Sequence, residues 1–214
     1  MTSTDALILD LSADLAPVKR RSMARDALFL LALAAVELAL VFGMGAMRPD
    51  MGMVILSPYM IWKLGSLALL ASLSSAIVMR SFTPPASARH GVALMLGIAG
   101  LIMVGGIFVT SAPDAGRSLI DRLSPAHGLI CTAAIVVLAL PMMAMLAVLM
   151  RRAAPVQPRD SAIAAGISAS TIGALVFAFC CPANDPLYIV VWYSAGVAMV
   201  TAIARWLLPR RFRL

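Results

Sequence analysis

Six long apolar runs constrain this sequence more than any other feature. They occupy the positions 26–47, 58–80, 91–112, 125–150, 161–180 and 186–208. A helix rises about 1.5 Å per residue, so each run is long enough to cross the roughly 30 Å hydrocarbon core of a bilayer. None of the runs alternates polar and apolar residues as membrane-barrel strands do, and only helices and closed barrels satisfy their backbone in lipid. We therefore expect an all-α protein, a polytopic membrane bundle of six transmembrane helices.

The composition excludes several other classes of protein. Of the 214 residues, 62% are hydrophobic and only 13% are charged. Average soluble domains are about half apolar and about one quarter charged. Surface-to-volume scaling leaves a soluble fold of this size too little interior to bury so many apolar side chains. A soluble enzyme, a nucleic-acid-binding domain and a disordered chain are therefore excluded.

Lysine and arginine are distributed unevenly between the two sides of the six runs. One side, which includes both ends of the chain, carries thirteen of them: Lys19, Arg20, Arg21, Arg25, Arg80, Arg89, Arg151, Arg152, Arg159, Arg205, Arg210, Arg211 and Arg213. The opposite loops carry Arg48, Arg117 and Arg122. Because cytoplasmic loops carry the excess of basic residues, this bias predicts that both termini are cytoplasmic. The net charge of +7 is then an orientation signal, and we expect no direct contact with nucleic acid.

The segment 1–22 precedes the first run and has a pattern of its own. On a helical wheel four apolar side chains share an arc of about 100°, namely Leu7, Ile8, Leu11 and Leu15. The charged residues of this helix are acidic, and they include Asp10 and Asp14. A helix that lies on anionic lipid is typically basic, so this one better suits a basic groove on a partner protein. The alternative is a tail without a partner.

Two ionisable residues lie within the apolar runs. Glu37 is near the middle of the first run, and Lys63 lies about five residues inside the second. Ionisable groups at such depth are costly and are usually paired or functional. Two interpretations stay open: the two side chains form an ion pair, or Lys63 reaches outward to the interface while Glu37 is protonated against a neighbouring helix.

Soft metal ligands gather at the predicted outer side. Cys131 lies near the outer end of the fourth run with His127 one helical turn before it, and Cys180 and Cys181 close the fifth run. The first outer loop adds four methionines, Met44, Met47, Met51 and Met53. Thiolate, imidazole and thioether groups favour soft ions, Cu(I) above all. We expect Cys131 and Cys181 to hold one such ion, with His127 as third ligand and the other side chains delivering the ion or completing the site.

Two further interpretations of these residues stay open. Methionine is a common core and lipid-facing residue, which would reduce the loop methionines to packing. Cys131 and Cys181 would instead form a disulfide if the oxidising periplasm favours it. Cys180 and Cys181 are neighbours in the chain and are poorly placed to bridge each other without strain.

Two stretches of the sequence resemble the motifs of one family. The stretch Cys181-Pro182-Ala183-Asn184-Asp185-Pro186-Leu187-Tyr188, which runs on to Trp192-Tyr193, resembles the signature of NrsF-like membrane anti-sigma factors. Leu9 to Val18, with Asp14-Leu15-Ala16-Pro17-Val18 before the basic cluster, is similar to the N-terminal motif of that family. The six runs and Cys131 in the fourth also fit, so the resemblance covers nearly the whole chain.

The resemblance implies a bacterial inner-membrane regulator that is not an enzyme. Residues 1–22 would sequester an extracytoplasmic-function sigma factor in the cytoplasm, and residues 23–214 would form the transmembrane sensor domain. Cys131 and Cys181 would correspond to the paired cysteines that sense heavy-metal or redox stress in the family. The chain would then need no obligatory cofactor, and a soft metal ion, copper in first place, would act as the regulatory signal.

Two other functions compete with this interpretation. A small metal-ion transporter or permease component would show broken helices and paired polar residues at the membrane midplane, and polar residues at depth are nearly absent here. A membrane thiol oxidoreductase would be expected to carry a Cys-x-x-Cys motif, which the sequence lacks. Both functions are therefore less favoured than sigma-factor regulation.

Overall fold

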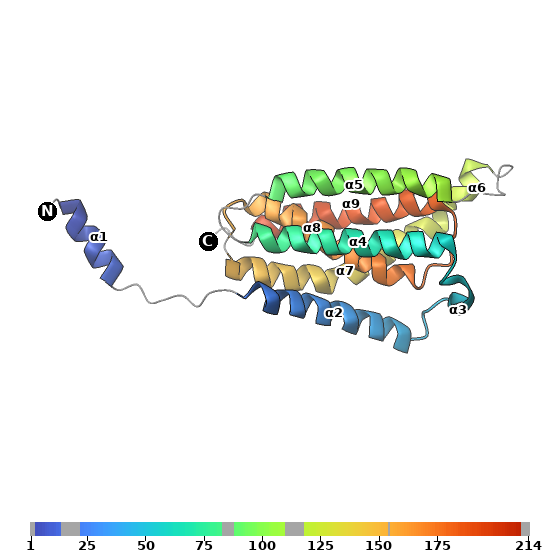
Figure 1. The fold of residues 1–214 in the computed structure, drawn as a ribbon, viewed down its shortest axis with the longest axis horizontal. Helices are drawn as coiled ribbons and strands as arrows, with labels where there is room; N and C mark the ends of the chain where they lie inside the picture. The colour runs from blue at the N-terminus through green and yellow to red at the C-terminus, as the bar shows by residue number, and fades with distance from the viewer. Residues whose placement is uncertain (1–2, 14–21, 83–87, 110–117, 154, 211–214) are drawn as a thin grey trace.

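The computed structural model describes residues 3–13, 22–82, 88–109, 118–153 and 155–210. Every regular element within these residues is an α-helix (Figure 1), and the elements are α1 (Ser3–Ala13), α2 (Met23–Gly43), α3 (Met51–Val54), α4 (Pro58–Ser81), α5 (Ala88–Val109), α6 (Leu119–Leu123), α7 (Pro125–Ala153), α8 (Pro158–Ala178) and α9 (Pro186–Arg210). Six of these, α2, α4, α5, α7, α8 and α9, are long and apolar enough to cross a membrane. The predicted all-α bundle with six membrane-length helices is confirmed.

The six long helices run up and down the bundle and bring like residues to the same end (Figure 1). We call one end the arginine end, because arginines from the six long helices gather there, among them Arg25, Arg80, Arg89, Arg151, Arg152, Arg159 and Arg205. The opposite end, at which α2 and α8 finish and α4, α7 and α9 begin, carries Arg48, Cys131 and Cys181, and we call it the cysteine end. Basic residues therefore segregate in space as they do in the sequence.

Helix α8 lies at the centre of the bundle and packs against α4, α7 and α9. Small side chains allow this close packing, because they let helix backbones approach each other in lipid. A Cβ atom on Gly166 would come within 2.7 Å of the Thr201 Cα of α9, and one on Gly173 within 3.0 Å of the Ala139 nitrogen of α7. The small residues of α8 are thus required for packing.

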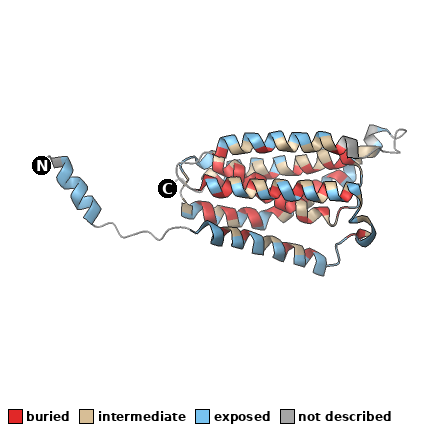
Figure 2. Ribbon diagram, viewed as in Figure 1, coloured by how far each residue is buried: buried red, intermediate tan, exposed pale blue. Residues whose placement is uncertain are grey.

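Exposed residues line the outer faces of the long helices (Figure 2), and many of them are large and apolar. Leu31 of α2, Leu101 of α5 and Ile130 of α7 are among the most exposed. A soluble monomer rarely exposes apolar patches of this extent, whereas a helix bundle in lipid gains from doing so. The surface of the bundle therefore fits a membrane protein.

Local sequence signals set the helix ends. The Ser22 hydroxyl accepts a hydrogen bond from the Arg25 amide at the start of α2, and Ser57 does the same for Met60 at the start of α4. The first apolar run was predicted to extend to residue 47, but α2 ends at Gly43. The cause is local, since Gly45 adopts a φ of 67° that a continuing helix excludes.

The N-terminal segment forms the helix α1 over Ser3–Ala13 (Figure 2). Three of its predicted contact side chains, Leu7, Ile8 and Leu11, are exposed, as is Asp10. Asp14 and Leu15 lie outside the described residues. The division of the chain into a binding segment and a sensor domain stays a prediction.

Candidate functional site: a buried cysteine pair

The structure brings together two cysteines that lie 50 residues apart in the sequence. Cys131 faces inward from the second turn of α7, and Cys181 follows the end of α8 with an exposed fraction of 1%. Both belong to one apolar cluster, whose other buried members are Leu67, Ile135, Ala174, Ala178, Tyr188, Ile189 and Tyr193. All three cysteines of the chain carry free thiols, and Cys180 is partly exposed beside the pair. The cysteine end thus contains a thiol pair shielded from solvent.

Aromatic side chains of α9 hold the Cys131 side of the pair. The Tyr188 hydroxyl and the Cys131 sulfur are hydrogen-bonded at 3.0 Å. One turn along α9, the Trp192 indole donates to the Leu123 carbonyl at 2.8 Å. The indole crosses α7 at Gly128, where a Cβ atom would lie 1.9 Å from the ring. Glycine at this position is therefore required for the close contact between α7 and α9 next to Cys131.

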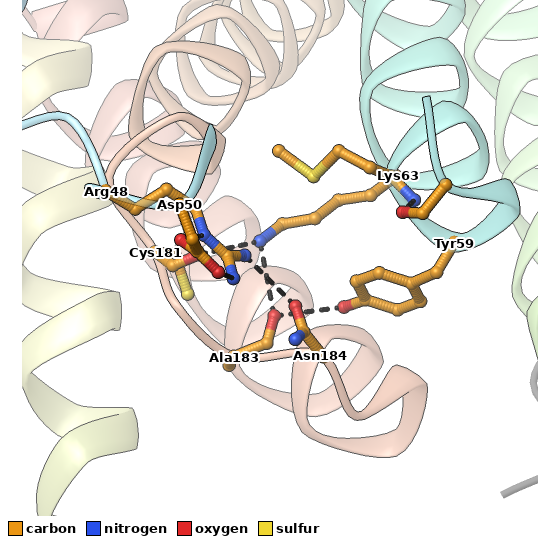
Figure 3. A network of polar contacts seen from close by, with 9 residues as sticks. Arg48, Asp50, Tyr59, Lys63, Cys181, Ala183 and Asn184 are labelled. Atoms are coloured by element: carbon orange, nitrogen blue, oxygen red, sulfur yellow. Dashed lines mark hydrogen bonds and ion pairs between the residues drawn. The ribbon is translucent and has the colours of Figure 1, made fainter. Parts of the chain in front are cut away.

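Lys63 holds the Cys181 side of the pair (Figure 3). Its side chain is 1% exposed, and its ammonium donates to the carbonyls of Cys181 at 3.2 Å and Ala183 at 3.4 Å. The Tyr59 hydroxyl donates to the same Ala183 carbonyl at 3.1 Å. The ammonium also lies 5.8 Å from the centre of the Tyr193 ring, within range of a cation–π attraction. Lys63 is thus buried against the backbone that carries Cys181.

Neither interpretation of Glu37 and Lys63 predicted this arrangement. Lys63 does not reach outward to the interface, and it binds carbonyls rather than Glu37. Glu37 is 6% exposed, and among the described residues its two carboxylate oxygens have no hydrogen-bond partner. The alternative of an ion pair is therefore wrong, because the α8–α9 connection offers Lys63 acceptors that sequence spacing did not reveal.

Two arginines fix the rest of the connection between α8 and α9. The Arg48 guanidinium binds both Asp50 oxygens at 2.6 Å and donates to the Asn184 side-chain oxygen at 3.0 Å (Figure 3). Arg122 binds both oxygens of Asp185, at 2.8 and 3.0 Å. The residues 181–185, which we call the cysteine segment, are therefore held from α4, from α6 and from the α2–α3 connection.

The arginine contacts also explain two exceptions in the charge pattern. Arg48 and Arg122 are two of the three basic residues on the side that is otherwise poor in them. Hydrogen bonds from Arg48 lower the pKa of Asp50, and Arg122 lowers the pKa of Asp185 although burial acts against it. Both pairs are therefore charged at neutral pH. Their role in holding the cysteine segment was not predicted, although their position on the side that is poor in basic residues could have indicated it.

The two adjacent cysteines differ in acidity. The pKa of the Cys181 thiol is lowered, first because the Cys131 thiol hydrogen-bonds its thiolate and further because the Lys63 ammonium is close, although burial acts against both. Burial raises the pKa of Cys180 instead. At neutral pH Cys181 is thus the thiolate of the site, and thiolates are both the nucleophiles and the metal ligands of cysteine chemistry.

The other predicted metal ligands do not join the pair. His127 is exposed, and its Nδ1 is hydrogen-bonded to the Ser124 hydroxyl at 2.9 Å. Three of the loop methionines, Met44, Met47 and Met53, are exposed, and Met51 is buried in α3. In the described part of the chain no three His, Cys, Asp or Glu side chains converge to hold a metal ion. The structure therefore gathers two of the predicted ligands, Cys131 and Cys181.

Fold and site together define a class of protein. The chain is a helical bundle that fits a membrane, and two cysteines are buried at one end of it with an ammonium and three phenols around them. A family model described as "Negative regulator of sigma F" matches residues 11–214. The chain therefore belongs to the NrsF family.

Two curated relatives cover nearly the same length. The chain is 30% identical over 205 residues to the anti-sigma-F factor NrsF of Caulobacter vibrioides, with 95% of each chain covered. It is 29% identical over 202 residues to the probable anti-sigma-F factor NrsF of Azospira oryzae, with 94% of each covered. No solved structure matches the chain. The predicted family resemblance is confirmed, and the family is named for regulation rather than for catalysis.

Proposed function

We propose that this protein is an anti-sigma factor of the bacterial inner membrane. Residues 1–22 hold an extracytoplasmic-function sigma factor on the cytoplasmic side, and the thiol pair Cys131–Cys181 receives a stress signal on the periplasmic side. Membership of the NrsF family is the observation that carries this proposal. The thirteen-to-three distribution of basic residues supports the orientation, with the arginine end in the cytoplasm.

The helix α1 supports the binding of a partner. Its exposed Leu7, Ile8 and Leu11 offer an apolar contact, and Asp10 adds a negative charge next to them. An amphipathic helix of this kind binds in an apolar groove whose rim carries the opposite charge. A basic-rimmed groove on the sigma factor is the partner surface that this helix fits.

The thiol pair supports a soft metal ion or an oxidant as the signal. Two cysteine sulfurs in an apolar, water-shielded cluster favour a soft ion such as Cu(I) over hard cations. His127 and the loop methionines would have to move to complete a larger ligand set. Alternatively, a peroxide oxidises the two thiols to a disulfide and is itself reduced by two electrons. Hydrogen peroxide then gives two molecules of water, and an organic peroxide gives one of water and one of alcohol.

Release of the sigma factor follows from a change in the relative stability of two states of the bundle. A signal shifts such an equilibrium by no more than its difference in affinity for the two states. Linking the two sulfurs through a metal ion or a covalent bond draws Cys181 and Cys131 together, and the cysteine segment must adjust. The repressing state is then the one in which both thiols are free.

Co-purification of the full chain from detergent, with a tag at the C-terminus, tests the proposal. We expect a sigma factor to co-purify and to be absent when residues 1–22 are deleted. Metal content and thiol titration after copper or peroxide treatment test the signal. Cys131→Ser and Cys181→Ser should abolish the metal uptake or oxidation and the release, whereas the control Cys180→Ser should retain both. Absence of any sigma factor from the wild-type complex would contradict the proposal, and a response that survives in both serine variants would remove the cysteine pair from it.

A further inference from the structure

Helix α2 is the part of the bundle that joins the two functional ends. It begins at Met23, directly after residues 1–22, and it ends at Gly43 on the cysteine end. Of its 21 residues only Asp26, Leu30, Glu37 and Val41 are buried. Glu37 adds little to its packing, because both carboxylate oxygens are buried without a partner among the described residues. The bundle core therefore holds α2 through few buried side chains.

Specific contacts instead fasten α2 at its cysteine end. The Phe42 ring packs edge-on against Phe179 with the ring centres 5.6 Å apart. The Arg48 amide donates to the Phe179 carbonyl at 3.3 Å, and the Arg48 side chain, 5% exposed, donates to Asn184 at 3.0 Å. The residues that follow α2 are therefore bound to the end of α8 and to the cysteine segment.

Arg48 is built to act as a rigid connector. Two hydrogen bonds to Asp50 fix the plane of its guanidinium, and a bidentate pair of this kind adds geometric specificity as well as energy. The remaining donor group then points to Asn184, three residues beyond Cys181 in the cysteine segment (Figure 3). A displacement of this segment is thus passed to the residues that follow α2 rather than absorbed by a flexible side chain.

We propose that Arg48 is a positioning residue that couples the cysteine pair to residues 1–22: through its contact with Asn184, α2 follows the movement of the cysteine segment. This inference rests on the proposed function. It adds the route by which a change at the thiols reaches the opposite side of the membrane. Lys63 and Arg122 hold the same segment from α4 and α6, so their contacts set its resting position, whereas the Arg48 contact carries the movement to α2.

The variant Asn184→Ala removes the coupling contact at an exposed position, where the fold does not depend on the side chain. Arg48→Gln removes the same contact by replacing the donor rather than the acceptor. The control Leu56→Ala changes an exposed side chain in the connection before α4. The variant Asn184→Asp leaves Arg48 unchanged and keeps an oxygen acceptor for its guanidinium. Each full-length variant is tested in cells before and after treatment with copper or hydrogen peroxide, whichever releases the sigma factor from the wild type.

Three quantities are read for each variant: sigma factor retained without stress, protection of the cysteines from alkylation after the stimulus, and sigma-dependent transcription. We expect Asn184→Ala and Arg48→Gln to retain the sigma factor and to show wild-type cysteine protection. Their induced transcription should fall at least about fivefold, the lower end of measured coupling between sites. The control should respond fully, and Asn184→Asp, which keeps the acceptor for Arg48, should retain most of the response.

Normal induction in both variants, or release without stimulus, would overturn the inference. The double variant Cys131→Ser with Cys181→Ser is included to separate this failure from failure of the proposed function. If that variant also responds normally, the proposed function fails. If it is unresponsive while Asn184→Ala responds, only the coupling role of Arg48 is wrong.

Discussion

Helices α2 and α8 have the same length, 21 residues, and both are apolar enough to span a membrane. Within these spans 83% of α8 is buried in the bundle and only 22% of α2. Small residues make α8 the packed centre that presents Cys181, whereas α2 faces outward with large apolar side chains and leads to α1. The difference teaches that the cysteine pair lies beside the most deeply buried helix of the bundle, whereas the segment that we propose to bind the sigma factor precedes a helix with few buried residues.

The largest effect is expected when a glycine in the buried helix α8 is replaced, compared with a glycine on an open helix surface. Gly166→Leu in α8 should destabilise the bundle by about 3 kcal/mol, because the new side chain meets the Thr201 backbone and the bundle core cannot yield. The control Gly97→Leu in α5 should have little effect, since a Cβ there meets no atom within 4 Å. Thermal unfolding of the detergent-solubilised protein measures both. Equal melting temperatures for the two variants would show that α8 is not the packed centre.

The acidity of the cysteines sharpens the picture of the α8 end. Between pH 8 and pH 6 the alkylation rate of an ordinary thiol, with a pKa of about 8.5, falls by up to roughly a hundredfold as the thiolate is protonated. Cys180, whose pKa is raised, should follow this fall. The alkylation rate of Cys181 should fall much less over the same range, because its lowered pKa keeps it a thiolate.

Alkylation with a small reagent, quantified for each cysteine by mass spectrometry, measures this difference in pH profile. Cys131→Ala serves as the matched variant, because loss of the thiol that hydrogen-bonds the Cys181 thiolate should shift the Cys181 profile to higher pH. Parallel profiles for Cys180 and Cys181 in the wild type would contradict the assignment of Cys181 as the thiolate.

The binding segment is tested by truncating one exposed leucine. Leu11→Ala should weaken sigma-factor binding by about 2 kcal/mol, or roughly thirtyfold, if Leu11 is an anchor in an apolar groove. Leu9 of the same helix is similarly exposed but lies off the predicted stripe, so Leu9→Ala should cost much less. Titration of the purified full-length variants with the co-purified sigma factor gives both affinities. A larger loss for Leu9→Ala would place the contact on the other side of α1.

The smallest expected effect concerns the packing of α2. Glu37→Leu replaces a buried carboxyl without a partner by an apolar side chain, and it should stabilise the bundle by about 1 kcal/mol. Glu37→Gln keeps the unpartnered polar group and should change the stability less. The melting temperature is again the readout. Destabilisation by Glu37→Leu would mean that the carboxyl stabilises α2 in the bundle.

Much of the fold was predictable because its signals are local. Length and hydropathy identified the six long helices, and the second run, 58–80, lies within the observed α4. The short helices α3 and α6 were not predicted, since four or five residues carry no periodic pattern. The early end of α2 depends on the backbone conformation of Gly45 within a stretch that is apolar throughout.

The site was predictable in its cysteines and not in its polar contacts. Cys131 and Cys181 were expected to meet because both mark the same end of membrane-length helices. The contact between Arg48 and Asn184 spans 136 residues of sequence and depends on how two loops pack, which no local pattern encodes. His127 was expected beside Cys131 from helical spacing, but it lies in the first turn of α7, where the hydroxyl of Ser124 engages its ring instead.

Release of the sigma factor from a purified complex tests the central claim most directly. The full chain and its sigma factor are reconstituted in a lipid nanodisc, and copper or hydrogen peroxide is added while bound sigma factor is measured. We predict that the wild-type complex dissociates and that the variant with Cys131→Ser and Cys181→Ser stays intact under the same treatment. Dissociation of both complexes to the same extent, or of neither, would contradict the claim that the buried thiol pair controls the binding segment.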